Sequence, residues 1–238
     1  MNTKQTLLHK SLMVCLLLAI AAFGGGEAQA APITFNVSVS LPNNVVGTSG
    51  FLNLQFNPGG GDARPAMATV TNFSTTGGGT LAAAVERLGA VTGTLPGTVT
   101  LNNTGQLNDY FQGTQFGSGF SFNVTLSGLA LDAPGNTTAG TAFALLLFRD
   151  ANGATPLFAP LSANVPSGSL LRILINPNGS TTVLLDAAPT AGLGVSVTQQ
   201  GATAVPEPAT LALLGTGLIG VAAKVRRRRT QPGTDISL

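Results

Sequence analysis

Few side chains in this sequence could carry out chemistry, and they are unevenly distributed along the chain. The one cysteine, Cys15, and the one histidine, His9, both lie within the first 30 residues. Between residues 31 and 204 the chain has no Cys, His or Lys. Nucleophilic catalysis of the Ser-His or Cys-His type needs a base that titrates near neutral pH. We therefore expect no catalytic residue in this segment and no enzymatic activity.

The charged residues of the same segment are sparse. They are Arg64, Arg87, Arg149 and Arg172, with Asp62, Glu86, Asp109, Asp132, Asp150 and Asp186. A pair of carboxylates can hydrolyse glycosides, so a glycoside hydrolase stays open as a weaker alternative. Because the acids outnumber the bases, the net charge of +2 on the whole chain comes from its two ends. The segment therefore has no basic face, and we expect no nucleic-acid binding.

Metal and cofactor sites are not expected either. Zinc and copper sites usually need His or Cys ligands, which this segment lacks. The one calcium-like stretch, Asp150-Ala151-Asn152-Gly153, lacks the further acids of a calcium loop. A hairpin turn is the better interpretation of that stretch, since Asn and Gly favour tight turns.

Tyr110 is the one ligand candidate that the sequence offers in this segment. Carbohydrate sites favour exposed Trp and Tyr, and the chain has no Trp and one Tyr. The stretch 108–112 combines this aromatic side chain with polar neighbours. Burial tendencies favour the opposite interpretation, a strand that enters the core with Phe111 buried. A carbohydrate-binding or adhesive module is therefore the alternative function.

Apolar residues recur mostly with a period of two, which is typical of strands. Alternation predicts half-buried strands over 33–41, 52–56 and 120–127. Continuous apolar runs predict strands buried on both faces over 143–148 and 170–175, with short strands at 183–185 and 195–197. The one helical prediction is 80–89, where Leu81, Val85 and Leu88 share a helix face. The abundant threonines form no regular Thr-x-Thr array along the chain.

Turn residues separate these segments and indicate the fold class. Asn57-Pro58-Gly59, Asp150–Gly153 and Asn176–Gly179 each offer Gly or Asn for a tight turn, and the last two predict hairpins. About 174 residues are enough for one domain with a real core. Strands joined by such turns predict an all-β antiparallel β-sandwich of the jelly-roll type over 31–204.

The N-terminal segment has the pattern of a secretory signal peptide. Lys4, His9 and Lys10 form a positively charged start, and residues 12–23 are apolar. The small residues Ala28 and Ala30 define a cleavage site before Ala31. We therefore expect residues 1–30 to be removed by signal peptidase during export.

The C-terminal segment combines a rigid acidic tripeptide, an apolar run and a basic cluster. Pro206, Glu207 and Pro208 come directly before the apolar run 209–223, which ends at the basic residues Lys224, Arg226, Arg227, Arg228 and Arg229. A helix over residues 209–225 would span about 25 Å, close to the thickness of a bilayer core. The basic cluster should stay cytoplasmic, so the sequence predicts a membrane helix with the 31–204 segment on the far side.

These residues resemble the PEP-CTERM sorting signal of exported bacterial proteins. The resemblance implies recognition by a membrane-embedded exosortase, cleavage near the tripeptide and release toward the cell surface or an exopolysaccharide matrix. Such signals commonly end soon after the basic cluster, whereas residues 230–238 add a polar tail here. The segments 93–99 and 108–111 also resemble small β-rich exported proteins that bear this tail and have no assigned activity.

The sequence thus predicts four parts: a signal peptide (1–30), a β-sandwich (31–204), a sorting signal (205–229) and a polar tail (230–238). The predicted function is that of an exported cell-surface or matrix protein without catalytic activity. It would be anchored transiently in the inner membrane before exosortase processing, with an exopolysaccharide as a further expected partner.

Overall fold

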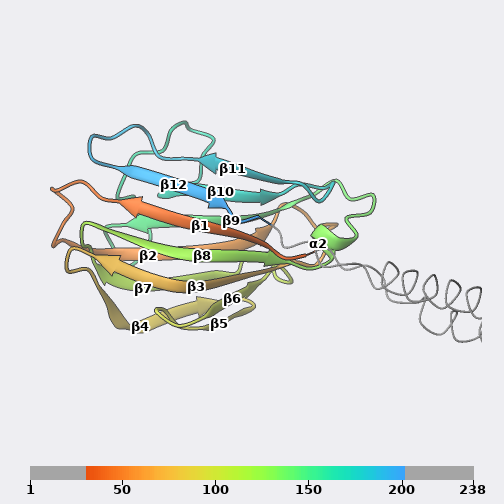
Figure 1. Cartoon of the computed structure of the whole chain (residues 1–238), viewed down its shortest axis with the longest axis horizontal. Helices are drawn as coiled ribbons and strands as arrows, with labels where there is room; N and C mark the ends of the chain where they lie inside the picture. Colours follow the sequence, from red (N-terminus) through yellow and green to blue (C-terminus); the bar gives the residue numbers. More distant parts are fainter. Residues whose placement is uncertain (1–30, 202–238) are drawn as a thin grey trace, which may run out of the picture. The chain divides into compact units, whose positions relative to one another are not determined.

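The computed structural model of the protein describes residues 31–201 (Figure 1). The predicted signal peptide, tripeptide, membrane helix, basic cluster and polar tail all lie outside the described residues, apart from Ala31 beside the predicted cleavage site. Within 31–201, no helix has the length and hydropathy that crossing a membrane requires.

Two antiparallel six-stranded sheets pack against each other in the described part of the chain (Figure 1). The first sheet has the order β12 (Gly194–Gln199), β1 (Ile33–Ser40), β8 (Gly119–Ser127), β3 (Met67–Thr76), β6 (Val99–Asn102) and β5 (Val91–Gly93). The second has the order β11 (Thr181–Leu185), β10 (Ser169–Ile175), β9 (Thr141–Phe148), β2 (Ser49–Pro58), β7 (Asp109–Gln115) and β4 (Thr80–Leu88). One short helix, α2 (Leu129–Asp132), follows β8. The prediction of an all-β antiparallel sandwich is confirmed.

The strand order is that of a jelly roll with additions. In the first sheet β1-β8-β3-β6 are neighbours, and in the second β2-β7-β4 are neighbours, so successive strands from β1 to β4 alternate between the sheets. β5 pairs with β6 in place of extending the second sheet beyond β4. Strands β9, β10 and β11 widen the second sheet next to β2, and β12 widens the first next to β1.

The core forms where the inner faces of the two sheets meet. Phe35, Val37 and Val39 of β1 are almost fully buried, and the residues between them are exposed. This alternation is the one predicted from the period-two pattern. Strand β9 is buried on both faces, also as predicted: Phe143, Leu145 and Leu147 belong to the main core. Its other face, with Ala144, Leu146 and Phe148, belongs to a second cluster.

One of the local predictions, the helix over 80–89, is wrong. Residues 80–88 form strand β4, not a helix, and pair antiparallel with β7. The hairpin at 176–179 is confirmed, since the Asn176 amide donates to the Ser180 carbonyl (2.8 Å) between β10 and β11. At 150–153 there is a turn, in which the Asp150 carboxylate accepts from nearby backbone amides. After this turn the chain returns beside β9, since Phe148 and Pro156 form an isolated antiparallel bridge and the Arg149 backbone amide donates to the Thr155 carbonyl (2.9 Å). The next strand, β10, begins only at Ser169.

Candidate functional site

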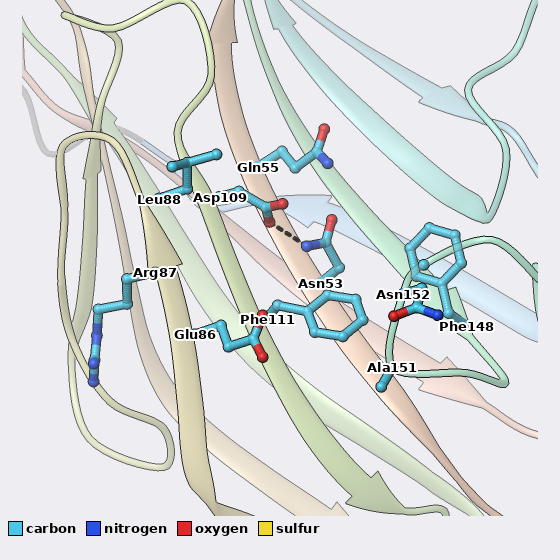
Figure 2. A pocket seen from close by; sticks show the side chains of 11 residues that line it. Asn53, Gln55, Glu86, Arg87, Leu88, Asp109, Phe111, Phe148, Ala151 and Asn152 are labelled. Carbon is cyan, nitrogen blue, oxygen red and sulfur yellow. Dashed lines mark hydrogen bonds between the residues drawn. The ribbon is translucent and has the colours of Figure 1, made fainter.

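The outer face of the second sheet bears a groove of about 470 Å³ (Figure 2). Its lining residues are Asn53 and Gln55 of β2, Glu86, Arg87 and Leu88 of β4, Asp109 and Phe111 of β7, Phe148 of β9, and Ala151, Asn152 and Gly153 of the following turn. Small-molecule sites commonly have volumes of this order. We call this feature the outer groove.

Strand alternation places these side chains in the outer groove. Leu52 and Leu54 of β2 point into the core, so Asn53 between them points to the opposite face. Tyr110 of β7 likewise points inward, which directs Asp109 and Phe111 outward. The groove is therefore built from residues that alternate with the core residues along each strand and point away from the core.

Two phenylalanines, Phe111 and Phe148, line the outer groove, and Phe51 lies behind them in the same group of rings. The rings of Phe51 and Phe111 are stacked, with centroids 5.1 Å apart and planes at 13°. Phe148 continues the group at 6.1 Å from Phe111. These rings belong to the second cluster, so they lie against Ala144 and Leu146 on the face that points away from the core. The result is an apolar platform beside polar groups, as in ligand sites with a few fixed polar contacts.

Asn53 is the central polar group of the groove and is only 1% exposed. Its Nδ2 donates to the Asp109 carboxylate, toward which it points in Figure 2, and to the Tyr110 carbonyl (3.3 Å). Its Oδ1 is buried and has no hydrogen-bond partner among the described residues. A buried acceptor without a donor is costly. Asn53 is also one of the residues that line the outer groove.

Asp109 is the acid most affected by this environment. Burial raises the pKa of its carboxyl group above the usual value; the hydrogen bond from Asn53 opposes the shift, and the negative charge of Glu86 adds to it. Both acids line the groove, so the glycoside hydrolase alternative has a place in the structure where it can be tested.

We expect Asp109→Asn to be more stable than the wild type at pH 7. A raised carboxyl pKa means that the folded protein binds this proton more tightly than the unfolded chain does. The protonated carboxyl therefore contributes stability at pH below 3.8, and that contribution is lost as the pH rises through the folded-state pKa. Asparagine keeps the shape without the charge. Urea denaturation of both proteins at pH 7 and pH 3 measures the difference, which should vanish at the lower pH; a less stable variant at pH 7 would contradict it.

Tyr110, the predicted ligand candidate, is not in the groove. It is fully buried. Its hydroxyl accepts a hydrogen bond from the Leu95 backbone amide (2.9 Å) and donates one to Gln112 Oε1 (2.6 Å). Phe111, which the sequence placed in the core, is the aromatic residue of this stretch that lines the groove. The strand and its neighbourhood were predicted, but the two faces were interchanged.

The basic residue of the groove is held by its own contacts. Arg87 donates from Nε to the Gly93 carbonyl (2.8 Å) and also to the Thr94 hydroxyl. Figure 2 shows its side chain directed away from Asn53 and Asp109. Within residues 31–201, no group of three or more His, Cys, Asp or Glu side chains is arranged to hold a metal ion. The chemistry of the groove is therefore that of amides, carboxylates and phenyl rings.

A comparison with protein families finds a match for the C-terminal segment. Residues 204–229 match the family described as the PEP-CTERM protein-sorting motif. The match includes the predicted tripeptide 206–208 and the basic residues up to Arg229. No curated protein and no solved structure matches the chain. The family assignment thus concerns the sorting segment, and the groove has to be interpreted from its own geometry.

Proposed function

From the premise that this chain is an exported, exosortase-sorted protein with a PEP-CTERM motif, we propose that its β-sandwich is a non-catalytic polysaccharide-binding module. The proposed place of action is the cell surface or the exopolysaccharide matrix. Signal peptidase would remove residues 1–30, and the segment 209–225 would anchor the chain in the inner membrane until exosortase acts. The observation that supports binding is the phenylalanine platform beside the buried, unpartnered oxygen of Asn53.

A sugar ring fits this combination of groups. One face of a pyranose ring carries C–H groups, which pack against the flat face of an aromatic ring. Its hydroxyl groups can both donate and accept, so they suit the acceptor oxygens of Asn53 and Asp109 and the amide of Gln55. A ligand that brings a hydroxyl to Asn53 Oδ1 also removes the cost of leaving that oxygen unpaired.

Hydrolysis of the sugar is the second candidate, and the raised pKa of Asp109 favours it. A raised carboxyl pKa is typical of the general acid in glycosidases. A hydrolase, however, needs its two carboxylates held at a defined separation. Glu86 is exposed on the edge strand β4, and its carboxylate has no hydrogen bond within the described residues. Because no hydrogen bond fixes the position of this carboxylate, the groove favours binding over turnover.

The test is the affinity of the full-length chain, purified in detergent, for exopolysaccharide from cells that produce the exosortase. We expect Phe111→Ala to weaken binding about tenfold, because an aromatic contact worth more than 1 kcal/mol is lost. Leu107→Ala, which truncates a 45% exposed apolar residue outside the groove, is the matched control and should bind normally. Equal affinity of the Phe111 variant and the wild type would rule out the groove as the binding site.

A further inference from the structure

The outer face of the first sheet carries no charge. All ten charged side chains of residues 31–201 lie in the second sheet, in α2 or in loops, and none lies in β12, β1, β8, β3, β6 or β5. Exposed strands and surfaces of soluble proteins usually carry charged residues, which keep copies apart. A six-stranded outer face without any is therefore an unusual surface that needs an explanation.

Three rows of hydroxyl and amide side chains cross this face, perpendicular to the strands. The first row is Thr34, Thr125, Thr69, Thr100 and Thr92, one from each of five neighbouring strands. The second row is Thr198, Asn36, Asn123 and Thr71. The third row is Ser196, Ser38, Ser121 and Ser74. We call these thirteen residues the hydroxyl face.

One hydrogen bond in each row joins side chains of two neighbouring strands. Thr34 and Thr125 share a bond of 2.9 Å between their hydroxyls, and Ser74 and Ser121 share one of 3.2 Å. In the middle row Asn36 Nδ2 donates to Asn123 Oδ1 (3.0 Å). Neighbours within a row are about 4.8 Å apart, and successive rows are about 6.8 Å apart along the strands. The face is thus a two-dimensional array of donors and acceptors, interrupted in β3 by the register shift between Thr71 and Ser74.

We propose that the hydroxyl face is a second binding surface and that its partner is an extended, neutral polysaccharide lying flat across the rows. The absence of charged side chains on this face argues for a partner without charge. The face has no cation to pair with uronate, sulfate or phosphate groups and no anion to pair with amines. Removing neutral hydroxyls from water costs far less than removing charges, and ordered side chains lose little further entropy on binding.

This surface does not depend on the outer groove, because it belongs to the other sheet. The outer faces of the two sheets point away from each other, so one molecule has a polysaccharide site on each side. Two sites on one rigid domain connect separate polysaccharide chains and raise the overall avidity of the protein for polysaccharide. A protein with both sites would cross-link a matrix.

The experiment measures retention of the full-length chain, in detergent, on microcrystalline cellulose as an insoluble neutral glucan. Ser38 and Ser74 are exposed positions of the third row. Replacing both serines with lysine adds two positive charges to the array. We expect the Ser38→Lys/Ser74→Lys variant to lose retention about tenfold or more, because those charges would be desolvated against a neutral surface. The matched control, Ala83→Lys/Val183→Lys, adds the same charge to exposed positions of the second sheet and should be retained like the wild type.

The remaining outcomes are decisive in either direction. Leu107→Ala, which lies outside both surfaces, should be retained on cellulose like the wild type. Loss of retention in Phe111→Ala alongside an unaffected Ser38/Ser74 variant would assign binding to the groove only. A wild type that does not bind cellulose overturns the proposed partner. Circular dichroism verifies folding; if the lysine variant does not fold, Ser38→Ala/Ser121→Ala tests the same row without added charge and should also weaken retention.

Discussion

Asp186→Ala is expected to lower the free energy of unfolding by about 3 kcal/mol. The Asp186 carboxylate is 3% exposed and accepts two bonds from Arg172, from Nε (2.6 Å) and Nη2 (3.0 Å), and one from the Ser169 hydroxyl (2.7 Å). Its removal leaves a guanidinium that is only 23% exposed without its counter-charge. The same pairing raises the pKa of Arg172, chiefly through the hydrogen bond to Asp186. This cluster ties β10 to the segment that follows β11.

Thermal and urea unfolding of the full-length chain in detergent measure this loss, which should lower Tm by roughly 10 °C for a domain of this size. Asp132→Ala makes the same change of charge at a residue of α2 that forms no side-chain hydrogen bond within the described residues. It should change stability by no more than about 0.5 kcal/mol. An Asp186 variant as stable as the Asp132 variant would show that the ion pair contributes nothing.

Replacing Pro206, Glu207 and Pro208 together with alanine is expected to abolish processing of the sorting signal. The two prolines keep the acidic tripeptide extended, whereas three alanines would favour continuation of the following helix. A protease that needs an extended segment would then lose its substrate. Mass spectrometry of the protein from exosortase-producing cells should find residues 209–225 in the variant and not in the wild type.

Deletion of residues 230–238 is the control for this experiment. The family match ends at residue 229, so processing should continue without the polar tail. Retention of residues 209–225 in the wild-type protein would contradict exosortase processing, whatever the variants do.

The strands that sequence analysis found have an uninterrupted period of two or are short or continuous apolar runs, as β9 and β10 are. Strand β3 was missed because its alternation breaks: Ala68 and Val70 point inward, and then Asn72, with a φ of 56°, shifts the register so that Phe73 is the next buried residue. Strand β4 was mistaken for a helix for a related reason. A bulge between Leu81 and Val85 interrupts the plain alternation, and the two inward-facing residues are four positions apart, a spacing that a helix face and a strand face share.

The outer groove could be predicted only in part. The stretch 108–112 was identified correctly as the place where aromatic and polar side chains meet, but a shift of one residue exchanges the two faces of a strand. Tyr110 faces inward because the Leu95 amide and Gln112 satisfy its hydroxyl there. Asn53 and Phe148 join the groove from strands distant in sequence, so no local pattern connects them.

The hydroxyl face could not be recognised in the sequence, for a geometric reason. Its rows run across the strands, so consecutive members such as Thr34 and Thr125 are far apart in sequence. The absence of a regular Thr-x-Thr array along the chain therefore gave no information about rows of hydroxyl side chains that run across the sheet.

The most direct test of the central claim is to incubate the full-length wild type with the exopolysaccharide and measure bound polysaccharide and its chain length together. A polysaccharide-binding module predicts saturable binding with unchanged chain length over many hours. Shortened chains, with shortening abolished by Asp109→Asn, would instead identify a glycoside hydrolase. The absence of saturable binding would contradict the proposed function altogether.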